Sequence, residues 1–191
     1  MEISSFVLLG LVLASLVYAV LIYNGLVSLK HGVSKAWANI DVLLKQRHEE
    51  LPKLVETCKQ YMQYEQETLE QVMKARSAVS QAREQADMGA LGAAEGQLRL
   101  GLGNLFALAE AYPELKANET FQHLQSRITG LENSIADRRE FYNESVNNNN
   151  IRIEQFPDLI LARVFNFRLA ELLEFSAKEK ADLDLGKLFA G

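Results

Sequence analysis

The chain has 191 residues, a formal net charge of -5 and charges of both signs spread along its length, so no basic surface for nucleic acid is predicted. Cys58 is the only cysteine, which excludes an internal disulfide. Only three prolines interrupt long stretches of Ala, Leu, Glu, Gln, Lys and Arg, which are strong helix formers, and this composition predicts an all-α fold.

An uncharged, apolar run covers residues 3–29. Crossing the hydrocarbon core of a bilayer takes about 20 apolar helical residues, so the run is long enough to span a membrane. A cleaved signal peptide would have a basic segment before the run and a small-residue cleavage site after it. Met1 and Glu2 precede the run instead, and no such site follows it. We therefore predict an uncleaved transmembrane anchor over residues 1–29.

Basic residues follow the apolar run and none precedes it. Lys30 and Lys35 come directly after it, and Lys45 and Arg47 lie a little further on. Because cytoplasmic flanks of membrane helices are enriched in Lys and Arg, we expect the N-terminus outside and the rest of the chain in the cytoplasm. The N-terminal flank is very short, so the opposite orientation stays open.

Apolar residues at alternating spacings of four and three predict a long helix after the anchor. The pattern begins at Val33 and Trp37 and continues as far as Val79. Pro52 removes one backbone donor and disfavours helical geometry at the preceding residue, so a kink or short break is expected near Glu50.

Glycine and alanine become frequent over residues 86–103. The first part of this segment is predicted to be a turn that reverses the chain, followed by a second helix over residues 90–111. Glycines inside a helix cost up to about 1 kcal/mol each relative to alanine. We interpret them as positions where a neighbouring helix approaches closely.

The third long helix has the most regular apolar pattern, which begins at Phe121, Leu124 and Ile128 and closes at Val146. Such a repeat predicts a coiled-coil-like partner, either within the same chain or in another subunit.

The end of the chain is predicted to consist of short segments. Four asparagines at residues 147–150 favour a turn. Beyond that turn we expect a brief helix after Pro157, a last helical piece around residues 169–175, and a charged tail over residues 177–191.

Three groups of residues resemble the LemA family. They are residues 37–48 with 51–57, residues 108–118, and residues 138–143 with Val146, Asn150, Phe156, Pro157 and Phe167. Asn149 departs from the family pattern, which usually has an aromatic residue there. The match covers nearly the whole chain in the right order.

The resemblance implies a membrane-anchored, antiparallel bundle of long helices over residues 30–176. It also implies a bacterial inner (cytoplasmic) membrane protein, with a periplasmic bundle as the alternative orientation. The resemblance supplies no activity, although a magnetosome-associated member of the family suggests a task in organising membranes.

Residues that could carry chemistry are scattered. No pair among His31, His48 and His123 has zinc-ligand spacing. Glu119 and His123 are one helical turn apart, but a di-iron bundle needs a second such pair and two further carboxylates. We therefore predict no catalytic, cofactor-binding or metal-binding residues and no small-molecule substrate. The alternative is a hydrolase or metal-dependent enzyme with a dispersed site, formed by Glu65, Glu110, Glu119 and His123.

Several polar residues fall on or beside the predicted apolar seams. A buried, paired charge can fix the register between similar helices, whereas a long arginine can instead extend its head group to the surface. Both interpretations stay open for the candidate polar layer, which comprises Arg47, Glu65, Arg138 and Asn143.

The segment around Pro157 is strongly apolar and is a candidate interaction surface for a peptide or lipid. Its residues are Phe156, Pro157, Leu159, Val164, Phe165 and Phe167. Together with the anchor and the long helices, this surface favours a non-enzymatic membrane scaffold that binds a second copy of itself or another membrane-associated protein.

Overall fold

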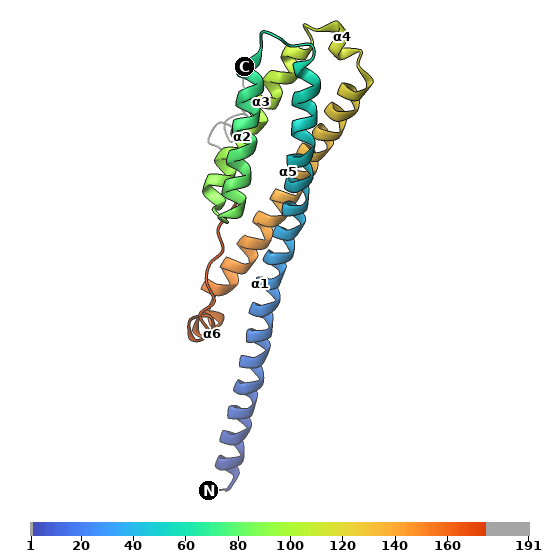
Figure 1. Ribbon diagram of the computed structural model, residues 1–191. Helices are drawn as coiled ribbons and strands as arrows, with labels where there is room; N and C mark the ends of the chain where they lie inside the picture. The colour runs from blue at the N-terminus through green and yellow to red at the C-terminus, as the bar shows by residue number, and fades with distance from the viewer. Residues whose placement is uncertain (1, 175–191) are drawn as a thin grey trace, which may run out of the picture. The chain divides into compact units, whose positions relative to one another are not determined.

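The computed structural model describes residues 2–174, and within them it contains only helices (Figure 1). The helices are α1 (Glu2–Lys59), α2 (Gln66–Glu84), α3 (Met88–Ala109), α4 (Pro113–Lys116), α5 (Glu119–Glu154) and α6 (Asp158–Val164). The predicted all-α class, with a long N-terminal apolar helix and a helical bundle, is confirmed.

The helices form two compact units. The described part of the first unit comprises residues 2–38 and 141–171, and that of the second unit comprises residues 39–140 and 172–174. The boundaries predicted from the sequence, at residues 29 and 176, differ from this division and stay a prediction. The predicted tail over residues 177–191 lies outside the described residues.

Helix α1 is continuous through Pro52, so a break near Glu50, one of the two expected outcomes, is wrong. The helix ends at Lys59, and the chain turns over residues 60–65 before α2 begins. The turn is closed by backbone bonds from Tyr61 and Met62 to the Cys58 carbonyl. The apolar pattern that we assigned to one long helix is therefore shared between α1 and α2.

The second unit buries the regular seam of α5 within the same chain. Asn118 begins this helix, because its Oδ1 accepts from the Phe121 backbone N–H at 3.0 Å and its Nδ2 donates to the Tyr61 hydroxyl at 3.0 Å. Four seam residues on α5 are buried: Phe121, Leu124, Ile128 and Ile135. The sequence predicted a partner helix for this seam either within the same chain or in another subunit, and the structure shows one within the same chain.

The chain reverses between α2 and α3, as the change in composition predicted. Ala86 has a φ of 53°, and Asp87 caps α3 by accepting from the Ala90 backbone N–H at 2.8 Å. A Cβ on Gly101 would lie 3.4 Å from Val72 Cγ2 of α2, so the interpretation of close helix packing holds there. A Cβ on Gly92 would lie 2.2 Å from the carbonyl oxygen of Glu174, which requires glycine at this crossing.

Helix α5 continues to Glu154, so the turn predicted at residues 147–150 is wrong. The Asn150 side chain is used for a tertiary contact instead. Its Nδ2 donates to the Ala170 carbonyl and its Oδ1 accepts from the Ala170 N–H, both at 2.9 Å. Residues 167–174 are not helical, which corrects the helix predicted around residues 169–175, as far as that segment is described. Asn150 satisfies the backbone groups that such a helix would have paired.

Helix α6 is the brief helix expected after Pro157, and it packs on α1 in the first unit. Ile22 and Leu26 of α1, Ile153 of α5 and Ala162 of α6 form its buried core. Arg152 of α5 forms an ion pair with Asp158 at the start of α6.

Candidate functional site

A buried ion cluster holds three helices of the second unit together. Arg47 of α1 donates from Nη2 to Glu95 Oε1 of α3, and from Nη1 to Glu132 Oε1 of α5 at 2.5 Å. The exposed fractions of the three side chains are 1%, 6% and 19%. Burial alone would lower the pKa of Arg47, but the charges of Glu95 and Glu132 outweigh it and raise that pKa above its usual value. Arg47 therefore stays charged at any physiological pH.

The predicted polar layer forms only around Arg47. Glu65 lies in the turn after α1, where its carboxylate accepts from the Tyr112 hydroxyl and raises the pKa of Tyr112. Arg138 is exposed, and the neighbouring Arg139 is the buried residue of that helix turn. Asn143 belongs to the first unit. Within the second unit, the ion cluster of Arg47 thus includes neither Glu65 nor Arg138.

Sequence reasoning missed both carboxylates of the cluster. Glu95 is the only acidic residue in α3, where it lies within an Ala- and Gly-rich apolar segment. That isolation was a usable signal, because a lone carboxylate on an apolar helix needs a cationic partner. Glu132 lies among other polar residues of α5, and nothing in its surroundings marks it.

Arg76 explains why Pro52 does not break α1. A proline cannot donate to the carbonyl four residues earlier, which is that of His48. Arg76 Nε of α2 donates to this carbonyl at 2.9 Å, and Arg76 Nη2 lies 2.6 Å from His48 Nε2. Burial, followed by the charges of Arg76 and Arg83, lowers the pKa of His48. The missing backbone bond is thus replaced by a bond from the adjacent helix.

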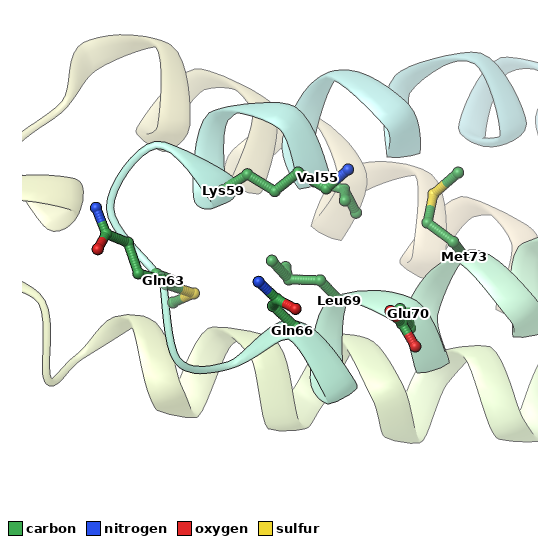
Figure 2. Close-up of a pocket in the computed structure, with 8 residues that line it drawn as sticks. Val55, Lys59, Gln63, Gln66, Leu69, Glu70 and Met73 are labelled. Carbon is green, nitrogen blue, oxygen red and sulfur yellow. The ribbon is translucent and has the colours of Figure 1, made fainter.

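An open groove of about 770 Å³ lies between the last turns of α1 and the first turns of α2 (Figure 2). Its lining combines flexible apolar side chains with charged and amide groups: Val55, Lys59, Met62, Gln63, Gln66, Leu69, Glu70 and Met73. Figure 2 shows Lys59 and Val55 across the groove from Leu69, Gln66 and Glu70. Methionine side chains adapt to the shape of what they contact, so this lining suits the side chains of another protein.

The residues of the alternative enzyme site have separate environments. Glu65 bonds to Tyr112, and Glu110 pairs with Lys116. Glu119 and His123 are exposed on the first turns of α5. Within residues 2–174, no group of three or more His, Cys, Asp or Glu side chains is placed to hold a metal ion. Cys58 is fully buried, and burial raises the pKa of its thiol to about 12, so it lies in the core as a protonated thiol.

The apolar run of α1 has the length and composition to cross a membrane. Its large apolar side chains from Ile3 to Leu21 are exposed, whereas Ile22 and Leu26 are buried. The candidate interaction surface is exposed at Phe156, Val164 and Phe165 and half-buried at Pro157, Leu159 and Phe167.

These features define an all-α, membrane-associated protein with one N-terminal apolar helix and a helical bundle. The chain belongs to the LemA family, which matches residues 36–185. This confirms the family expected from the three groups of sequence motifs.

Curated relatives include magnetosome proteins. The chain is 33% identical over 106 residues to magnetosome protein MamQ 2 of Paramagnetospirillum magneticum AMB-1, which covers 56% of this chain and 39% of the relative. It is 24% identical over 172 residues to magnetosome protein MamQ of Magnetospirillum gryphiswaldense MSR-1, covering 78% of this chain and 63% of the relative. The chain therefore spans between about two fifths and two thirds of the length of these relatives.

Proposed function

We propose that the protein is a non-enzymatic, membrane-anchored scaffold that binds a second copy of itself or another membrane-associated protein. The observation that carries this proposal is the continuity of α1, which contributes both the exposed apolar run and buried positions of the second unit. Anchoring limits a protein to the membrane surface, and this raises its effective concentration toward partners on the same surface. The names of the magnetosome relatives support a role at a membrane.

The groove between α1 and α2 is the surface that we assign to the partner. The seam of α5 is already buried inside the chain and needs no second subunit. Among its described residues, the second unit exposes few large apolar side chains, namely Val42, Tyr64, Leu100 and Leu172. Val55, Met62 and Leu69 form the buried floor of the groove, Met73 is half-buried at its side, and charged Lys59 and Glu70 lie beside them.

The proposed location is the bacterial inner membrane, with the N-terminus outside and the second unit in the cytoplasm. Exposed Lys30 and Lys35, directly after the apolar run, support this orientation. A periplasmic second unit is the alternative orientation.

A photocrosslinking amino acid at Gln66, in the groove, is expected to form a protein adduct of one defined mass in intact membranes. The matched control is the same amino acid at Gln97, which is exposed on α3 and does not line the groove. Mass spectrometry of the adduct distinguishes a second copy from a different protein. Introducing Met73→Glu should reduce the Gln66 adduct, because a partner that covers the groove would have to desolvate a second carboxylate beside Glu70. Equal adducts at Gln66 and Gln97, or none at Gln66, would contradict the assignment of the groove.

A further inference from the structure

The depth at which α6 lies relative to a membrane follows from where the apolar run of α1 enters the hydrocarbon core. A helix over residues 3–29 is about 40 Å long, whereas the hydrocarbon core is about 30 Å thick. If the core begins near Ile3, about 20 residues fill it, and residues 23–29 lie in the interfacial layer. Lys30 and His31 mark the polar end of the run. The buried residues Ile22 and Leu26, on which α6 packs, are therefore at the boundary between acyl chains and head groups.

The outer face of α6 is apolar and has no protein partner among the described residues. Ile160 and Val164 lie one helical turn apart on α6 and are 56% and 71% exposed, and Phe156, two residues before the helix, is 78% exposed. Phe165 directly follows α6 and is 54% exposed, although its ring also contacts α1, where it lies 4.8 Å from the ring of Tyr23. Because α6 packs sideways on a helix that crosses the bilayer, its outer face points laterally into whatever surrounds α1 at that depth. In a single-pass protein, lipid surrounds the transmembrane helix at that depth.

Exposed basic side chains lie around this face, and basic side chains complement an anionic lipid surface. Lys30, Arg163 and Arg168 are exposed, and none of the three forms an ion pair with another described residue. Lys30 and Arg168 line one shallow pocket of about 330 Å³ with Asn149 and Phe167. The one acidic residue of α6, Asp158, is buried and paired with Arg152. Basic side chains near a membrane surface are attracted to anionic head groups, and Tyr23 is the kind of aromatic residue found at that level.

We propose that α6, with Phe156 and Phe165, inserts into the interfacial layer of the leaflet on the Lys30 side, as a second membrane contact beside the anchor. Lys30, Arg163 and Arg168 then face the phosphates of anionic lipids. This inference rests on the membrane anchor and does not depend on the scaffold role or on the groove.

The test places an environment-sensitive fluorophore on Ile160→Cys of the full chain in nanodiscs of phosphatidylcholine and phosphatidylglycerol. Native Cys58 is buried and its thiol has a pKa of about 12, so the unsubstituted chain serves as the labelling control. The matched position is Glu144→Cys, which is exposed on α5 near Tyr142, whose ring contacts Trp37 well beyond Lys30. Spin-labelled lipids of shallow depth should quench the label at position 160 at least about threefold more strongly than the label at position 144.

Two further comparisons, one with a double variant and one with a different lipid composition, complete the test. Phe156→Asp with Val164→Asp should reduce the quenching at position 160 to the level at position 144, and nanodiscs of phosphatidylcholine alone should weaken it. Equal quenching at positions 160 and 144 would overturn the insertion. A label that is shielded from water but not quenched by lipid would show that a protein covers α6, which also overturns it. Equal quenching with and without phosphatidylglycerol would overturn the role of the three basic residues.

Discussion

Replacing Arg47 with methionine is expected to lower the free energy of unfolding by about 3–5 kcal/mol, because it leaves Glu95 and Glu132 buried without their counter-charge. The measurement is urea unfolding of the detergent-extracted full chain, followed by circular dichroism. Lys74→Met is the matched control, because Lys74 is exposed on α2 and its loss should change stability by no more than about 0.5 kcal/mol.

A triple variant separates the cost of the unpaired carboxylates from the cost of losing the arginine itself. Arg47→Met combined with Glu95→Gln and Glu132→Gln removes all three charges, so it should recover a large part of the lost stability. Replacing a whole buried cluster by neutral groups is often close to neutral, whereas breaking it on one side is not. If Arg47→Met cost no more than Lys74→Met, the cluster would not hold the three helices together.

Placing arginines at Leu11 and Leu13 is expected to release the protein from the membrane. Both leucines lie near the middle of the apolar run and are exposed. An arginine at the centre of a membrane helix costs about 2.5–3.5 kcal/mol on insertion scales, so the pair costs about 5–7 kcal/mol. The fraction of the protein that stays in the pellet after alkaline washing of membranes should fall sharply.

The control for this change is Leu11→Ile with Leu13→Ile, which keeps the apolar character and should leave the pelleted fraction unchanged. Retention of the double-arginine variant in the washed pellet, at the level of the control, would show that the apolar run is not what holds the chain to the membrane.

Local pattern was enough to predict the helices whose apolar faces repeat. The run over residues 3–29, the helix after the glycine-rich turn and the regular seam of α5 all follow from spacing alone. The brief helix after Pro157 was also expected from its apolar composition. In each of these elements, the helical structure is determined by residues within the element itself.

The predictions that failed depend on contacts between residues far apart in the chain. Pro52 is tolerated because Arg76 supplies a donor to the His48 carbonyl. The asparagines at residues 147–150 stay helical because Asn150 bonds to the backbone of Ala170, and Asn149 is buried. Helix propensity and turn propensity describe a segment by itself, so they cannot anticipate a partner that tertiary structure brings to it.

The candidate sites also contain some features that the local sequence predicts and others that depend on tertiary contacts. An arginine on an apolar seam could be recognised at Arg47, but its partners could not be chosen among many carboxylates. The choice of Arg138 in place of Arg139 was wrong by one residue, because exact helical phase drifts along a long heptad pattern. The apolar residues around Pro157 were recognisable as a surface, but the packing of α6 on Ile22 and Leu26 could not be predicted from the sequence.

We propose that the protein assembles with a partner because it is anchored in the membrane. The most direct test is the size of the complex captured by chemical crosslinking in intact membranes, compared between the wild-type chain and the variant with arginines at positions 11 and 13. We expect a complex of one defined mass for the wild-type chain and the loss of that complex in the released variant. A wild-type chain that stays monomeric in the membrane, or an identical complex formed by the released variant, would contradict it.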